Sequence, residues 1–190
     1  RYQGGANAGH TVKVQDETYI FHLIPSGILY PDTVCVIGNG VVFDPDAFTK
    51  EIDDLKKRNL DVLERIIISD ACHLILPLHR IIDEYRENQA GGKKIGTTKR
   101  GIGICYADKM MRIGLRMGDL MDSARLKERL QHIVEVKNRE LKNLYGLAEV
   151  TLQPMYDSYS AFAEKVAPLV RNTSLYLNQE LKKGKTVLLE

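Results

Sequence analysis

The stretch that decides the fold is residues 33–50, TVCVIGNGVVFDPDAFTK. Its apolar first part, residues 33–43, predicts a buried β-strand. A helix is then expected to start at Asp44-Pro45, because proline is well tolerated at the first helical position. Phe48, Ile52 and Leu55 repeat at helical spacing and continue that helix.

The same alternation extends to both sides of this stretch. RIIIS (65–69) predicts a second short strand, and residues 74–85 predict a second helix. TVKV and TYIFHLI, separated by QDE, predict a hairpin over residues 11–24. This order predicts an α/β fold, with a partly parallel sheet and surrounding helices.

The second half of the sequence is helical in pattern. One apolar stripe is formed by Leu126, Leu130, Ile133, Leu141 and Leu144. Another helix is expected from near Pro154 through Tyr159, Phe162, Val166 and Leu169, with a kink or break at Pro168. A further helical stretch ends at Gly184, before an apolar run at residues 186–190 that predicts the start of a strand.

Composition excludes several classes of protein. The chain has 190 residues, a formal net charge of +2, and 44% hydrophobic and 27% charged residues. Its basic residues are spread along the chain, which argues against a nucleic-acid surface. No apolar run approaches the roughly 20 residues that span a bilayer. Cys35, Cys72 and Cys105 lack metal-binding spacing and indicate reduced thiols, so we expect a cytoplasmic protein with neither nucleic acid nor membrane as partner.

A glycine-rich stretch, QGGANAGHTV at residues 3–12, surrounds His10 with small side chains. Bare backbone can bring N–H groups close to phosphate oxygens. Asn7 and Thr11 add neutral hydrogen-bonding groups, and His10 adds an imidazole, a side chain suited to acid–base chemistry. A glycine-rich turn with a histidine exposed by chance fits the pattern equally well.

A second candidate site is the loop expected over residues 88–103, where apolar periodicity stops. Its KKIGTTKRGIG suits an anion, because charged groups, hydroxyls and backbone N–H groups occur together. A solvated flexible loop is the competing interpretation. Arg112 and Arg116 fit a solvated pair on one helix face. Four other histidines have no ligand-like neighbours and indicate packed or surface residues: His22, His73, His79 and His132.

Six stretches taken together resemble the adenylosuccinate synthetase family. In the family's order and spacing they are QGGANAGHTV, FHLIPSGIL, IGNGVV, IGTTKRGIG, YADK and GLRMGDL. The resemblance covers Arg1 to Glu190 and implies one larger P-loop-like domain. It also implies a GTP-dependent enzyme that uses Mg²⁺, IMP and L-aspartate. In that reaction GTP phosphorylates O6 of IMP, and the aspartate amine then displaces the phosphate to give adenylosuccinate.

The resemblance also implies roles for individual residues. His10 corresponds to the family's catalytic histidine, a general acid toward the GDP leaving group. Gly9, His10 and Thr11 are implied to lie along the GTP phosphates, with the Gly9 carbonyl as a Mg²⁺ ligand. The implied IMP contacts are Asn7, Ala8, Gly9, His10, Thr98 and Arg112. Arg112 is implied to act across the interface of a homodimer.

The expected organisation places an α/β part with the histidine at residues 1–87 and a mobile IMP-phosphate loop at 88–103. A helical part with dimer contacts follows at 104–185, and the next strand starts at 186–190. The family's phosphate loop and its aspartate and guanine segments are not among these residues, so we expect an internal segment of the enzyme. The alternative is a non-catalytic fragment or dimerisation module. A stand-alone GTPase is disfavoured because the sequence has no P-loop motif.

Overall fold

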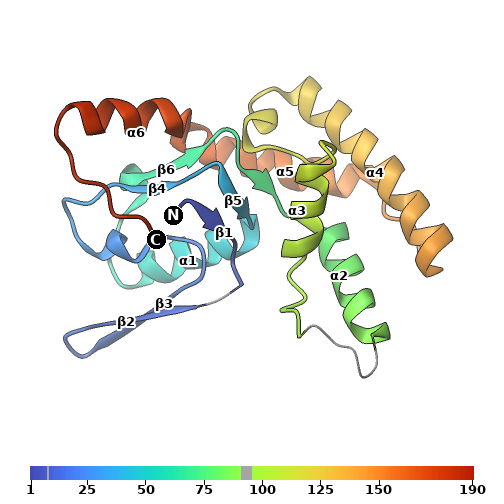
Figure 1. Ribbon diagram of the computed structural model, residues 1–190, viewed down its shortest axis with the longest axis horizontal. Helices are drawn as coiled ribbons and strands as arrows, with labels where there is room; N and C mark the ends of the chain where they lie inside the picture. Colours follow the sequence, from blue (N-terminus) through green and yellow to red (C-terminus); the bar gives the residue numbers. More distant parts are fainter. Residues whose placement is uncertain (8, 91–95) are drawn as a thin grey trace.

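A parallel β-sheet lies at the centre of the computed structural model, which describes residues 1–7, 9–90 and 96–190 (Figure 1). It consists of two three-stranded groups. The first group is β1 (Gln3–Gly4), β5 (Gly40–Phe43) and β7 (His73–Leu74). The second is β4 (Cys35–Ile37), β6 (Ile66–Ser69) and β8 (Val170–Arg171). These parallel pairs, together with the helices around them, confirm the predicted α/β fold.

The two groups are joined through Arg1. Its backbone nitrogen donates to the Val36 carbonyl at 2.7 Å, and its carbonyl accepts the Gly38 N–H at 2.8 Å. Residues 33–43 therefore form two strands, β4 and β5, where the sequence pattern predicts one. The chain at residues 1–4 lies between them, pairing with β4 on one side and β5 on the other. The insertion cannot be read from this stretch alone, although Gly38-Asn39-Gly40 interrupts its apolar residues where β4 ends and β5 begins.

Helices α1 (Pro45–Lys57) and α2 (Pro77–Gln89) follow the strands of the first half. The Asp44 carboxylate accepts the backbone N–H groups of Asp46 and Ala47, so it caps α1 at the position the sequence indicates. The second helix begins three residues later than predicted. Its N1 position is a proline, which cannot donate to the preceding turn, and residues 73–74 belong to β7 instead.

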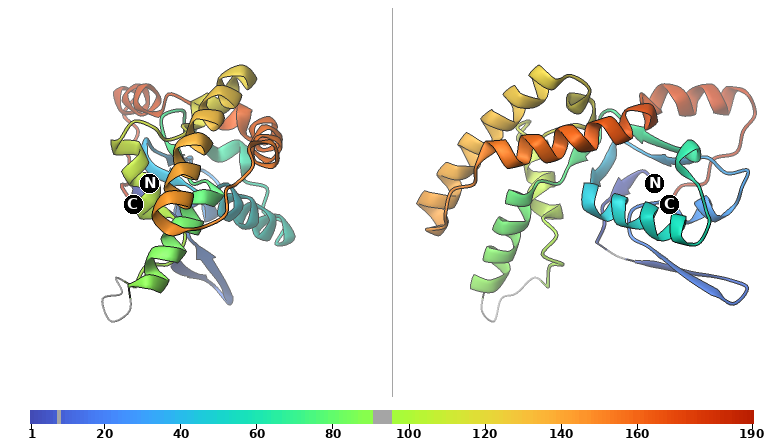
Figure 2. Two further views of the ribbon diagram at one scale, coloured as in Figure 1. Left: turned by 90° about the vertical axis from the view of Figure 1, so that its right-hand side faces the viewer. Right: turned by 180° about the vertical axis from the view of Figure 1, so that it is seen from behind.

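The second half consists of α3 (Ile102–Met110), α4 (Ser123–Tyr145), α5 (Leu152–Val166) and α6 (Thr173–Lys182). Helices α4 and α5 pack side by side (Figure 2). The α4 stripe is buried as predicted except for Leu144, which is exposed in the last turn. Helix α5 ends at Val166, so the break expected at Pro168 is confirmed.

Strands β2 (His10–Val14) and β3 (Glu17–Phe21) form the predicted antiparallel hairpin, which projects from the body (Figures 1 and 2). The end of the chain differs from expectation. Residues 185–190 have no regular secondary structure, because a strand needs a ladder of backbone hydrogen bonds to its neighbour rather than a single one. They run back beside the first residues, where the Tyr2 N–H donates to the Glu190 carbonyl at 3.4 Å.

The main core lies between the sheet, α1, α4 and α5. Phe43 of β5 contacts both Phe48 of α1 and Phe162 of α5 through tilted ring pairs. The three cysteines are buried and have free thiols, and burial raises the pKa of Cys35 to about 11. Within the described ranges, no helix combines the length and the apolar character needed to cross a membrane.

Candidate functional site

The glycine-rich segment changes from buried to exposed along its length. Gly5 and Ala6 are buried, whereas Asn7, Gly9, His10 and Thr11 are exposed. A Cβ atom on Gly5 would lie 2.9 Å from the Val42 side chain and 3.0 Å from the Val42 carbonyl. Packing therefore requires that glycine, while Asn7, Gly9, His10 and Thr11 face solvent. Ala8, an expected IMP contact, lies outside the described residues.

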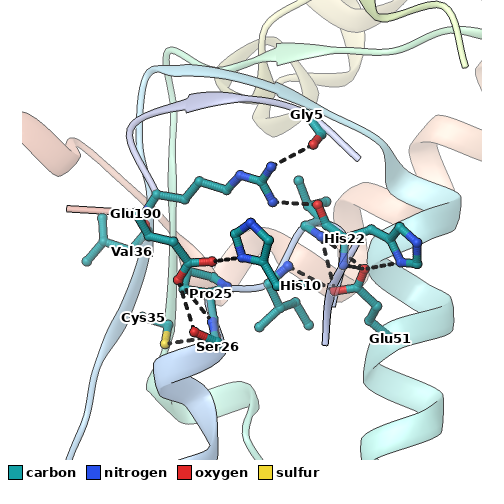
Figure 3. A network of polar contacts seen from close by, with 12 residues as sticks. Gly5, His10, His22, Pro25, Ser26, Cys35, Val36, Glu51 and Glu190 are labelled. Carbon is teal, nitrogen blue, oxygen red and sulfur yellow. Dashed lines mark hydrogen bonds and ion pairs between the residues drawn. The ribbon is translucent and has the colours of Figure 1, made fainter. Parts of the chain in front are cut away.

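His10 is paired with a carboxylate from the far end of the chain (Figure 3). Its Nδ1 lies 2.6 Å from Oε1 of Glu190. The other carboxylate oxygen, Oε2, accepts the Ser26 N–H at 3.1 Å and the Ser26 hydroxyl at 3.4 Å. The His10 side chain is 43% exposed, so a ligand can reach the ring in spite of this pair.

Glu51 of α1 holds the segment that carries Ser26. Its carboxylate accepts the backbone N–H groups of His22 at 2.7 Å, Leu23 at 3.0 Å and Ile24 at 2.9 Å (Figure 3). The Arg1 guanidinium donates to the His22 carbonyl and, at 2.8 Å, to the Gly5 carbonyl. The FHLIPSGIL stretch thus supports the glycine-rich segment that carries His10, a role that its sequence does not indicate.

The second candidate loop meets the first. The Arg100 guanidinium donates to the Ala6 carbonyl, directly beside Asn7. Helix α2 holds the loop from its other side, since Asp83 accepts the Gly101 N–H at 2.9 Å and Glu87 accepts the Gly96 N–H at 2.8 Å. Thr98 lies exposed between these attachments.

Helices occupy both ends of the loop expected over residues 88–103. Helix α2 continues to Gln89, and α3 already begins at Ile102. Gly101 marks this junction with a φ of +75°. A Cβ there would lie 2.7–2.9 Å from the Cβ of His79 and from the backbone of His79 and Arg80, so the glycine lets the loop touch α2. Residues 91–95 lie outside the described part of the chain.

Arg112 stands apart from this cluster. It follows α3 in the left-handed region, with a φ of 63°, and it is exposed. The helical spacing considered for Arg112 and Arg116 is therefore wrong, because the chain leaves the helix at Met110 and Arg116 bridges to His73. A nine-residue helix is about 14 Å long, so α3 separates Arg112 from Thr98 within one chain.

The YADK stretch contributes Asp108 to a buried network of charged and polar side chains. Asp108 is fully buried, with Oδ2 at 3.1 Å from Nε2 of His79 and Oδ1 at 2.6 Å from Nζ of Lys137. The Leu76 N–H donates to Nδ1 of His79, which leaves the ring proton on Nε2. Burial raises the pKa of Asp108, but its bonds to His79 and Lys137 outweigh this and lower the pKa below its ordinary value. The network ties α2, α3 and α4 together.

The other histidines match their expected roles. His73 and His79 are buried, His132 is exposed, and His22 packs at the edge of the Glu51 contacts. A hollow of about 620 Å³ lies between β3 and α1, lined by charges of both signs. Of the residues around the two loops, Arg100 reaches it, but His10 does not. We therefore place the candidate site at the His10–Glu190 pair and the adjoining loop rather than in the hollow.

Fold and site together define an α/β protein in which an exposed histidine lies on the glycine-rich segment that follows β1. A second loop, between α2 and α3, contacts that segment. The family model described as adenylosuccinate synthetase matches residues 1–190. This chain belongs to the adenylosuccinate synthetase family.

Relatives agree with this assignment. The adenylosuccinate synthetase of Heliobacterium modesticaldum is 46% identical over the whole chain, which covers 44% of that protein. That of Pelodictyon phaeoclathratiforme is 48% identical, with the same coverage. A structure titled fully ligated adenylosuccinate synthetase from Plasmodium falciparum superposes with a TM-score of 0.89 at 34% identity, covering all of this chain and 43% of that one. The chain thus spans less than half the length of these relatives.

Proposed function

We propose that this chain acts as part of an adenylosuccinate synthetase, a ligase of purine nucleotide biosynthesis. GTP would phosphorylate O6 of IMP, and L-aspartate would displace that phosphate to give adenylosuccinate, GDP and phosphate. The observation that carries the proposal is the meeting of the two loops, where Arg100 binds the Ala6 carbonyl next to the exposed His10 segment. Family membership over residues 1–190 supports it.

In this proposal the exposed groups contact two nucleotides, GTP and IMP. Gly9, His10 and Thr11 follow one another at the start of β2 and would line the GTP phosphates. Asn7, with Ala8, Gly9 and His10, would border IMP, and Thr98 would contact its phosphate. Phosphoryl transfer depends mainly on positioning and charge stabilisation, which exposed backbone and hydroxyl groups supply.

His10 would act as the general acid. As the bond between the β–γ bridging oxygen and the γ-phosphorus breaks, Nε2 would donate its proton to that oxygen and GDP would leave. The ring is accessible, and its contact with Glu190 uses Nδ1 rather than Nε2.

In this proposal Mg²⁺ is shared between the chain and the bound nucleotide. Among the described residues no group of three or more His, Cys, Asp or Glu side chains could hold a metal. Mg²⁺ is commonly bound by few protein oxygens together with substrate phosphates and water. The carbonyl of the exposed residue Gly9 would supply one such oxygen, and the bound ion would neutralise phosphate charge.

We further propose that Arg112 reaches the IMP of a partner subunit in a cytoplasmic homodimer. Arg112 is exposed beside Met110 and Met111, which are 69% and 65% exposed. Methionine and arginine are both enriched at protein interfaces. The distance along α3 from Thr98 favours a contact with the partner's site over one within its own chain.

The test is steady-state kinetics of a full-length protein that contains this chain. His10→Asn should lower kcat by roughly 10²- to 10⁴-fold, as expected for loss of a general acid, with much less effect on GTP binding. His132→Asn, at an exposed position of α4, is the matched control and should retain full turnover. Wild-type turnover in His10→Asn would remove His10 from the mechanism.

The isolated chain offers a second test. Residues 1–190 contain no P-loop motif, so most phosphate contacts would come from elsewhere in a full-length enzyme. Each missing charge-assisted contact weakens binding by about 1.5–3 kcal/mol, and roughly 1.4 kcal/mol is tenfold in affinity. Calorimetry should detect no GTP binding by residues 1–190. Micromolar binding would show that this segment holds a complete nucleotide site.

A further inference from the structure

We propose that Glu190 is a positioning residue for His10. Its carboxylate accepts Nδ1–H of the imidazole and so directs Nε2 toward the substrate. The proposal rests on the role proposed above for His10 and adds the group that orients the ring. The two residues are 180 positions apart in the sequence, and only the fold brings them to 2.6 Å.

Both oxygens of the Glu190 carboxylate are used. Oε1 contacts His10, while Oε2 accepts the backbone N–H and the hydroxyl of Ser26 (Figure 3). The side chain is 20% exposed, compared with 43% for His10. The carboxylate therefore cannot rotate away from the ring without losing its bonds to Ser26.

The segment that anchors this carboxylate is itself fixed. Glu51 binds three consecutive N–H groups at residues 22–24, and the Cys35 thiol lies 3.7 Å from the Pro25 carbonyl. The backbone carbonyl of Glu190 is also bonded, to the Tyr2 N–H. Rigid support from two sides is what a positioning residue requires, since misplacement by about 1 Å weakens catalysis severely.

The chemistry of the imidazole explains what the pair achieves. A neutral ring carries one proton, and an acceptor at one nitrogen decides where that proton stays. When His10 acts as an acid, the Nε2–H bond breaks, an O–H bond forms on the departing GDP, and the proton on Nδ1 remains. The resulting Nδ1–H tautomer is the one that donates to Glu190. The carboxylate thus holds the ring in one orientation throughout the transfer, as in catalytic triads.

A second histidine–glutamate contact nearby shows that proximity alone does not make a glutamate a positioning residue for an imidazole. His22 Nδ1 lies 3.8 Å from Oε1 of Glu51, beyond hydrogen-bond distance. The Glu51 carboxylate is occupied by backbone N–H groups, so it supports the chain rather than a ring. Of these two contacts, the His10–Glu190 pair combines an accessible ring with a short, anchored contact.

The first experiment compares two glutamate variants of the full-length protein. Glu190→Gln should lower kcat by about 10- to 100-fold and change KM values by less than about threefold, the pattern of a group that acts through the catalytic one. Glu180→Gln on α6 is the matched control. The Glu180 side chain is 21% exposed, and its Oε1 lies 2.7 Å from Nζ of Lys183. Glu180→Gln should leave kcat unchanged. Full kcat in Glu190→Gln would overturn the proposal.

The second experiment is a double-mutant cycle. In a His10→Asn background, Glu190→Gln should change kcat by less than about twofold, because its effect requires the imidazole. A merely structural glutamate would lower kcat by the same factor in both backgrounds. That additive result would contradict positioning.

Nitrogen NMR of ¹⁵N-histidine-labelled protein separates this proposal from the proposed function. Neutral His10 should be the Nδ1–H tautomer in the wild-type protein and should redistribute toward Nε2–H in Glu190→Gln. This measurement does not depend on turnover, so it tests the pair even if no adenylosuccinate is formed. Predominant Nε2–H in the wild-type protein would refute the role of Glu190.

Discussion

Replacing Lys137 by methionine should destabilise the protein far more than an ordinary surface substitution. Lys137 is 4% exposed, and its Nζ lies 2.6 Å from Oδ1 of the fully buried Asp108. Methionine keeps an unbranched apolar stem but leaves Asp108 with His79 as its remaining described partner. Breaking one side of a buried ion pair costs about 3–5 kcal/mol, because the other charge stays buried without its partner.

Lys142→Met is the matched control on the same helix. Its Nζ pairs with Glu149 at 3.3 Å, but the two side chains are 68% and 54% exposed. Solvent-exposed pairs contribute about 0–1 kcal/mol. Urea denaturation followed by circular dichroism should therefore show a loss in unfolding free energy at least about 2 kcal/mol larger for Lys137→Met than for Lys142→Met. Equal losses would refute the reasoning.

The pH dependence gives an independent check. In the native protein the bonds from His79 and Lys137 lower the pKa of Asp108 despite its burial, so this group stabilises the fold above its unfolded pKa. The contribution is lost as pH falls through the native pKa. The difference between wild type and Lys137→Met should therefore shrink as the pH falls through the acidic range. A second variant, Lys137→Met with Asp108→Leu, should recover stability because no unpaired charge remains.

Gly101→Ala should cost roughly 2–4 kcal/mol of unfolding free energy in urea denaturation, because its φ is +75° and a Cβ would meet the His79 backbone. Gly103→Ala, with open space around the position, should be neutral or stabilising. Equal effects of the two substitutions would contradict the close approach at Gly101. Burial, reinforced by Lys109 and Arg116, lowers the pKa of His73 to about 4. The fold should therefore lose up to about 3 kcal/mol of unfolding free energy as pH falls from about 6.5 to 4. The same pH dependence of the melting temperature in wild type and His73→Leu would argue against this. Arg112→Leu should weaken IMP binding but not GTP binding. Mixing it with His10→Asn should restore activity through dimers in which one site has neither defect; no recovery would rule out a contact across the interface.

The local pattern of the sequence was sufficient for most elements. Helix α1 begins at Asp44-Pro45 as predicted, because the cap and the first-turn proline act within a few residues of each other. The β2–β3 hairpin and the end of α5 before Pro168 follow from equally local rules. The glycine-rich surroundings of His10, together with the family resemblance, predict it as a site residue, and the structure shows that it is exposed.

Tertiary structure decided what depends on partners distant in the sequence. Residues 33–43 form two strands on either side of Gly38-Asn39, and the first residues of the chain lie between these strands. Residues 186–190 did not become a strand, yet Glu190 supplies the carboxylate at His10. An alternating or helical pattern reports which face of one element is buried, whereas a hydrogen bond between residues 180 positions apart exists only once the intervening chain has folded.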